Sequence, residues 1–76
     1  MPQAFLFITT EIGSEAQVLQ KLKEIRGVEE VYIVYGLYDL IAKVKIETIS
    51  ELRENIVSKI RKIGQVKSTS TMIVEE

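Results

Sequence analysis

The segment Gly36-Leu37-Tyr38-Asp39 is the part of the chain whose residue types and spacing best fit a ligand site. Asp39 is the only aspartate in the sequence, and it interrupts an otherwise apolar stretch. A glycine lets a ligand approach the backbone closely, and a neighbouring carboxylate can accept hydrogen bonds from an ammonium group. The same carboxylate could instead accept backbone N–H groups at a turn, which is a structural role. Both interpretations stay open at this point.

A second group of polar side chains is the run Ser68-Thr69-Ser70-Thr71. Such a run is typical of an edge strand, because threonine favours extended structure. In a strand, successive side chains alternate between faces, so this run places hydroxyl groups on both faces of the last strand. The alternative function is a polar corner that binds a carboxylate.

The composition excludes most chemistry beyond binding. The chain has 76 residues with no cysteine and no histidine, so it lacks thiol nucleophiles, disulfides, and the usual metal ligand and proton shuttle. General acid–base catalysis by Asp39 would require a second tuned group, and none is evident. No phosphate-binding loop, dinucleotide fingerprint or metal-ligand spacing occurs. We therefore expect no enzymatic activity, no metal and no cofactor.

Charge and hydropathy indicate where the chain acts. Ten Lys and Arg residues stand against eleven Asp and Glu residues, a net charge of -1, so direct nucleic-acid binding is not expected. No basic leader segment and no apolar run of roughly 20 residues is present, which indicates a cytoplasmic protein without membrane contact. The abundance of isoleucine, glutamate and lysine is similar to the usage of thermophiles.

Hydrophobic periodicity predicts five consecutive structural segments that would position the polar groups. The first segment is a strand over residues 4–10. It is followed by a helix that is capped by Ser14 and Gln17 and ends at Gly27. The third segment is a hairpin over residues 30–46 that turns near Gly36. A second helix follows, capped by Thr48 and Glu51, with an apolar stripe that ends at Gly64; a last strand covers residues 65–74. The predicted stripe consists of Ile49, Leu52, Ile56, Ile60 and Ile63.

The β-α-β-β-α-β order predicts one α+β domain over residues 1–76. Its expected architecture is ferredoxin-like, with a four-stranded antiparallel sheet and both helices on one face. Two short sequences also echo one another, because a helix end, a glycine and a strand entry occur at residues 22–28 and again at residues 60–66. One sheet face is then left without helices.

That uncovered face is predicted to be apolar and to form a dimer interface. If Leu6 and Leu40 face the helices, alternation sends neighbouring large apolar residues to the opposite side. So small a domain often depends on partners for stability, and disulfides and metals are not available here. The predicted interface consists of Phe5, Phe7, Tyr35, Leu37 and Ile41. Scattered exposed apolar residues are the alternative.

Three segments together resemble one known family. The segment VYGLYDLIAKV at residues 34–44, the helix exit IRGVEEV at residues 25–31 and the closing VKSTSTMIV at residues 66–74 stand in the same order and at similar spacing in that family. The chain thus resembles the effector-sensing (RAM) domain of the leucine-responsive regulatory protein and asparagine regulator (Lrp/AsnC) family, over essentially its whole length.

The resemblance implies a function. Domains of this family pair sheet to sheet as dimers, commonly assemble into rings of four dimers, and bind small amino acids between dimers. No helix-turn-helix segment precedes the first strand, so the chain looks like a stand-alone sensor that would act through a partner, such as a full-length relative. The pocket residues implied are Gly36, Leu37, Tyr38 and Asp39 in the hairpin, with Ser68, Ser70 and Thr71 in the last strand.

Other readings of the same element order stay open. An ACT-like domain would be expected to have a glycine-rich first loop, and residues 11–14 provide a single glycine. Small enzymes on this sheet, such as acylphosphatases or dimeric α+β-barrel oxygenases, need arginine loops or buried polar residues that are not evident. A purely structural assembly domain without a ligand is the last alternative.

Overall fold

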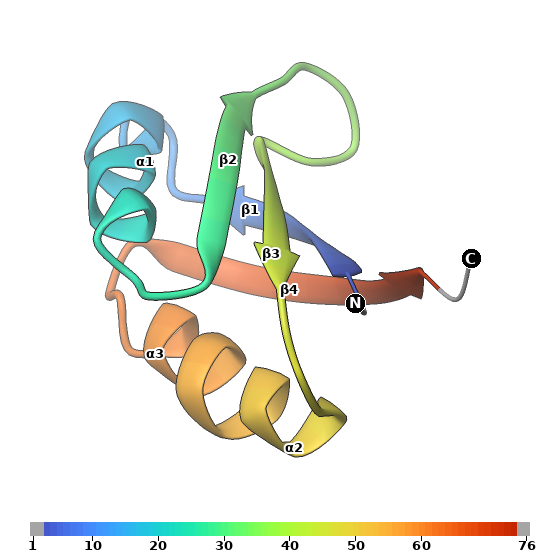
Figure 1. Ribbon diagram of the computed structural model, residues 1–76. Coiled ribbons are helices and arrows are strands. Elements are labelled where there is room, and N and C mark those ends of the chain that lie inside the picture. Colours follow the sequence, from blue (N-terminus) through green and yellow to red (C-terminus); the bar gives the residue numbers. More distant parts are fainter. Residues whose placement is uncertain (1–2, 75–76) are drawn as a thin grey trace.

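One antiparallel sheet organises the molecule, which a computed structural model describes for residues 3–74 (Figure 1). The strands are β1 (Gln3–Thr10), β2 (Val28–Ile33), β3 (Leu40–Lys45) and β4 (Val66–Val74). Their order in the sheet is β2-β3-β1-β4, with every neighbouring pair antiparallel. The strand and helix order and the ferredoxin-like sheet confirm the predicted fold class.

Two helical segments connect the strands. The first, α1, covers Glu15–Lys23. The second runs through residues 49–61 and changes character on the way, from α2 (Ile49–Glu51) through the π-helical η1 (Leu52–Val57) to α3 (Ser58–Arg61). A regular helix was predicted for this second segment, so its wider middle turns were not anticipated. Among residues 3–74, no helix combines the length and apolar character needed to cross a membrane.

The core lies between one sheet face and both helical segments. Alternate residues of β1, from Ala4 to Ile8, and of β3 with the residue after it, from Leu40 to Ile46, are at most 2% exposed. They pack with the buried apolar residues of the helices, which are Val18, Leu22, Leu52, Ile56 and Ile60. Both helices therefore cover the same face, as predicted. The prediction that Ile49 belongs to the buried apolar stripe is wrong, because Ile49 is 52% exposed at the start of its helix and does not join this core.

The two predicted helix caps have different outcomes. Glu51 donates its backbone N–H to the Oγ1 atom of Thr48 at 3.1 Å, so Thr48 caps the second helix. Ser14 stands at the start of α1 but makes no capping bond through its side chain. The capping box expected at Ser14 is therefore wrong. The Ser14 carbonyl accepts from Val18 N at 3.0 Å, which is the ordinary first hydrogen bond of the helix and not a cap.

We expect Thr48→Ala to lower the free energy of unfolding by about 1 kcal/mol, because one N–H at the helix start loses its acceptor. Ser14→Ala is the matched control and should change it by less than about 0.5 kcal/mol, since that side chain makes no cap. Urea denaturation of both variants measures the difference. Equal losses would show that the Thr48 hydroxyl contributes nothing as a cap.

The connection between β2 and β3 differs from the tight hairpin predicted near Gly36. The loop runs through residues 34–39, and Val34 N donates to Asp39 O at 2.9 Å to close it. Gly36 has a φ of +139°, a conformation that L side chains rarely adopt. Tyr35 and Leu37, expected on strands, lie in this loop with exposures of 100% and 91%. Their assignment to the strands is thus wrong, because pairing between β2 and β3 stops at Ile33 and Leu40.

The echo between the two halves of the sequence corresponds to equivalent backbone turns. After α1, Val28 N donates to Ile25 O at 3.2 Å, and after α3, Val66 N donates to Ile63 O at 3.1 Å. Each turn is followed by an edge strand of the sheet, β2 in the first half and β4 in the second.

Candidate functional site

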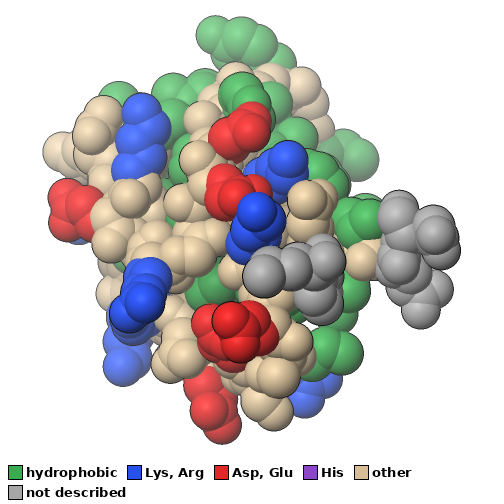
Figure 2. Space-filling model, viewed as in Figure 1, with side chains coloured by type: hydrophobic (Ala, Val, Ile, Leu, Met, Phe, Trp, Pro, Cys, Tyr) green, Lys and Arg blue, Asp and Glu red, His purple; other side chains and the backbone are tan. Residues whose placement is uncertain are grey.

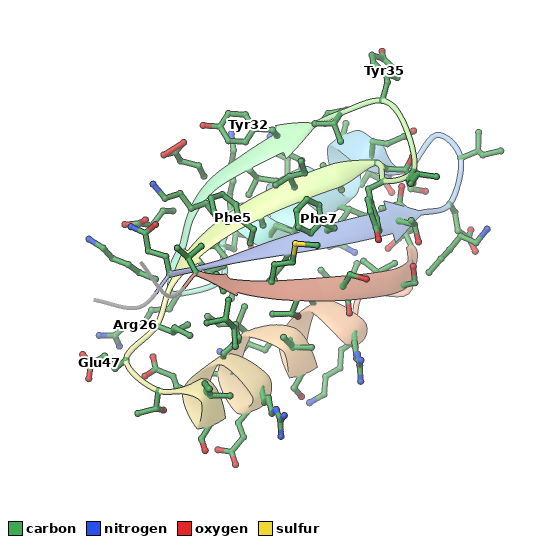
Figure 3. The ribbon with its side chains drawn as sticks, turned by 90° about the vertical axis from the view of Figure 1, so that its right-hand side faces the viewer. Phe5, Phe7, Arg26, Tyr32, Tyr35 and Glu47 are labelled. Atoms are coloured by element: carbon green, nitrogen blue, oxygen red, sulfur yellow. The ribbon has the colours of Figure 1, made fainter. Side chains whose placement is uncertain are left out.

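The sheet face opposite the helices carries a row of apolar side chains. Register pairs Tyr32 with Ile41, Ile41 with Phe7, and Phe5 with Met72, so these residues share one face. We call these five residues the open face. Figure 3 looks onto it, with Phe5 and Phe7 lying over the sheet and α1 behind it. Met72 is 61% exposed and Tyr32 51% exposed, whereas Phe5, Phe7 and Ile41 are partly buried.

Hydroxyl groups gather at the end of the open face nearest the β2–β3 loop. The ring of Tyr38 packs on Phe7 with centroids 5.3 Å apart, and its OH lies 3.5 Å from Ser70 Oγ. Thr9 Oγ1 and Ser68 Oγ are 2.6 Å apart on the same side. We call Thr9, Tyr38, Ser68 and Ser70 the hydroxyl cluster. The loop and the last strand, predicted to form one site, thus do meet here through Tyr38 and Ser70.

Asp39 ties the loop to the central strand. Its Oδ2 accepts the backbone N–H of Thr10 at 2.8 Å, and its own N–H donates to Ile8 O at 2.9 Å. Asp39 therefore accepts a backbone N–H, as the structural interpretation predicted, but the donor belongs to the distant strand β1 and not to the turn itself. Only Oδ2 has a hydrogen-bond partner within residues 3–74. Oδ1 therefore stays available to a ligand, and the two roles are compatible.

The rest of the loop leaves its backbone free. Across residues 3–74, the N–H groups of residues 35–38 donate to no acceptor of the chain. Tyr35 stands at the loop tip and points away from the sheet (Figure 3). Gly36 has nothing within 4 Å of the position where a Cβ would lie, so ligand or partner atoms can come close to the backbone there.

Thr71 does not belong with Ser68 and Ser70. It pairs with Leu6, which is fully buried, so it stands on the helix side of the sheet. Ser70 pairs with Phe7 on the open face. The implied pocket of Ser68, Ser70 and Thr71 is therefore wrong as one site, because neighbouring residues of a strand point to opposite faces.

Two threonines of this region were missed by the sequence reasoning. Thr9 reaches Ser68, and Thr10 supplies the N–H that holds Asp39. Their only signal was that consecutive threonines end the first strand. The β1–β4 register shifts between Thr9 and Thr10, so Thr9 pairs with Ser68 and Thr10 with Val66.

Charged groups lie on the same side of the sheet as the open face in both β2 and β3, where Lys43 pairs with Glu30 and with Phe5. Tyr32 donates its OH to Glu30, and this hydrogen bond to a carboxylate raises the pKa of the tyrosine above its usual value. Glu29 forms an ion pair with Lys45 at 3.6 Å. These exposed pairs contribute little to stability. These charged residues belong to β2 and β3, whereas the open-face residues of β1 are Phe5 and Phe7.

The arrangement is suited to binding. A carboxylate oxygen, four hydroxyls and unpaired backbone N–H groups lie at one end of an apolar surface. They provide an acceptor for an ammonium group and donors for a carboxylate. Within the described residues, no three acidic side chains come together as metal ligands.

Comparison with known proteins places this geometry in a family. The family model for the Lrp/AsnC ligand binding domain matches residues 3–76. An uncharacterised HTH-type transcriptional regulator from Pyrococcus abyssi is 34% identical over 73 residues, which are 92% of this chain and 49% of the relative. The chain thus spans about half the length of the curated relatives it matches.

Solved structures agree in fold. A hypothetical protein from Pyrococcus horikoshii is 43% identical with a TM-score of 0.90, covering 100% of this chain and 92% of that one. AsnC from Escherichia coli is 29% identical with a TM-score of 0.90, covering 99% of this chain and 51% of that one. The present chain therefore superposes on a relative of similar length and on half of a longer regulator.

Proposed function

This chain belongs to the Lrp/AsnC ligand-binding domain family, and from that premise we propose that it senses a small amino acid at the hydroxyl cluster beside Asp39. A second copy of the chain completes the site at the oligomer interface. The protein performs no catalysis and modulates transcription through partner regulators.

The observation that carries this proposal is the free Oδ1 of Asp39 next to the hydroxyl cluster. An amino acid presents an ammonium group and a carboxylate a few ångströms apart, so its site needs an acceptor and donors side by side. Asp39 supplies the acceptor, held in place by Thr10 through Oδ2. Ser70 and Tyr38, together with the N–H groups of the loop, supply the donors.

The exposed apolar surface supports a second copy as the partner. Met72 and Tyr32 are more than half exposed on the open face, and Tyr35 and Leu37 are almost fully exposed in the loop. Contiguous apolar exposure of this kind marks an interaction surface. In the proposed dimer the two open faces pack together, Tyr35 and Leu37 reach the partner, and further pairing of dimers gives an octamer.

The proposed effect on transcription is supported by relatives such as the HTH-type transcriptional regulator from Pyrococcus abyssi and the regulatory protein AsnC from Haemophilus influenzae. Charges of both signs are interspersed on the face shown in Figure 2, so that face offers no basic stripe for DNA. We therefore place a full-length regulator of the same family as the partner, in mixed oligomers in the cytoplasm. The Pyrococcus relatives are consistent with a thermophilic source.

Native mass spectrometry of the protein with a mixture of the twenty amino acids tests the proposal. We expect a dimer or octamer that retains one amino acid per site and so identifies the effector. An oligomer that retains none of them would support a purely structural assembly domain, and a monomer would remove the interface.

Asp39→Asn should weaken binding of the identified amino acid at least about tenfold while leaving stability nearly unchanged. The amide oxygen still accepts the Thr10 N–H, but the charge that attracts the ammonium group is gone. Asp39→Ala removes both functions and should also lower the free energy of unfolding by about 1–3 kcal/mol. Calorimetric titration and thermal unfolding of both variants separate the roles. Full affinity in Asp39→Asn would remove the carboxylate from the ligand site.

A further inference from the structure

A groove on the other side of the sheet combines an apolar floor with cationic walls. It lies between the second helical segment and β4, the edge strand that runs beside that segment in Figure 1, and has a volume of about 710 Å³. Its floor is apolar through Leu52, Val57 and Ile73. Arg53, Arg61 and Lys62 line it as well, with Thr71 of β4. We call this hollow the helix–β4 groove.

Among residues 3–74, no acidic side chain forms an ion pair with these three cations. Within residues 3–74, the single ion pair joins Lys45 and Glu29, so Arg53, Arg61 and Lys62 are all uncompensated. The other side of the same helix differs, because Glu47 and Glu51 line a separate hollow among cations there. In a chain of net charge -1, the helix–β4 groove therefore concentrates positive charge at one place.

The groove is polarised along its length. Ile49 and Ile73 are 52% and 42% exposed, and they mark its end at the start of the helix. Arg61 and Lys62 mark the opposite end, where Arg61 continues into a small hollow lined by Lys67 of β4. An occupant that matches this surface has an apolar tail at one end and a negative charge at the other.

The backbone at the groove is unusual. Leu52, Arg53 and Val57 belong to the π-helical η1, a conformation that is rare and recurs at functional sites. The wider turn shifts the side chains of η1 relative to those of a regular helix. Because β4 is an edge strand, the groove is also open to solvent along its outer side.

We propose that the helix–β4 groove is a second ligand site, which takes a small monocarboxylate with an aliphatic tail. The tail lies on Leu52, Val57 and Ile73, and the carboxylate is held by Arg61 and Lys62, while Arg53, about two helical turns earlier, adds positive charge to the groove wall. A volume of about 710 Å³ falls in the usual range of small-molecule sites. The groove is separated from Asp39 by the sheet, so this site does not depend on the amino-acid site.

Octanoate, octanol and octylammonium are the probes, titrated into the whole chain below micelle-forming concentrations and followed by two-dimensional amide NMR. We expect saturable shifts with octanoate confined to residues 49–62 and 71–73. Octanol should bind at least tenfold more weakly because it has no charge, and octylammonium should not bind. Equal affinity for octanoate and octanol would overturn the proposal.

The double variant Arg53→Gln/Arg61→Gln should lose at least tenfold in octanoate affinity, whereas Lys21→Gln/Lys23→Gln on α1 should lose none. If Arg61 only stabilised the helix through its dipole, the arginine double variant would unfold at a lower temperature but bind octanoate with unchanged affinity. That result would also overturn the proposal. Thr71→Glu places a negative charge in the groove and should abolish binding even if the arginine variant folds poorly. Asp39→Asn should bind octanoate with unchanged affinity. A failure of the octanoate site can therefore be distinguished from a failure of the amino-acid site.

Discussion

Phe7→Glu should convert the assembled protein to monomers, which sedimentation velocity would report as a drop to the mass of a single chain. Phe7 lies at the centre of the open face, on the central strand β1 and against Tyr38. In the proposed dimer, the new carboxylate would be buried without a partner. Burial of an uncompensated charge costs about 3–5 kcal/mol, so the dimer dissociation constant should rise at least a hundredfold.

Two controls separate this effect from misfolding. Ile12→Glu makes the same apolar-to-acidic change at a residue that is 102% exposed in the turn after β1, and it should leave the mass unchanged. Met72→Glu changes an open-face residue that is 61% exposed in the single chain, so it should dissociate the oligomer without unfolding the protein. If both open-face variants keep the native mass, the sheet-to-sheet dimer is wrong.

Gly27→Ala should lower the free energy of unfolding by about 2–4 kcal/mol, a large share of the stability of so small a domain. Gly27 has a φ of +100°, where an L side chain is strained. An added Cβ would also lie 3.3 Å from Lys45 O and 3.1 Å from Ile56 Cδ1, tighter than ordinary contact. A backbone shift that relieved these close contacts would disturb the hydrogen bond in which Lys45 N donates to Gly27 O at 2.9 Å.

Gly64→Ala is the matched control for that loss. Gly64 lies at the end of the second helical segment, its φ is not positive, and nothing is within 4 Å of its added Cβ. This variant should therefore be neutral or stabilised by up to about 1 kcal/mol. Guanidinium denaturation of both variants measures the contrast. A loss in Gly64→Ala as large as that in Gly27→Ala would show that the positive φ is not the cause.

The fold could be predicted because its signals are local. The alternation of buried and partly buried residues along β1, the Thr48 cap and the glycines after the helices each depend on a few neighbouring positions. The equivalent turns after α1 and α3 also reflect a short repeated sequence. These patterns were enough for the order of the elements and for the helix-covered face.

The details of the site could not be predicted, because they depend on contacts between distant residues. The role of Asp39 depends on the backbone of Thr10, which lies 29 residues earlier in the chain. The face on which Thr71 lies is decided by its register against Leu6 and cannot be read from β4 alone. The length of the β2–β3 loop follows likewise from where strand pairing stops, and so Tyr35 and Leu37 were placed on strands.

The position of β1 between β3 and β4 has a consequence for biosynthesis. This strand is translated before the others, yet its partners begin at Leu40 and Val66, so its pairing needs contacts across much of the chain. Proteins with such distant pairings fold slowly. Until β4 leaves the ribosome, the segment AFLFI of β1 can pair only with β3, so its other edge is an exposed apolar strand edge of the kind that aggregates. Slowing translation after residue 45 should therefore increase the insoluble fraction more than slowing it at the end of β4.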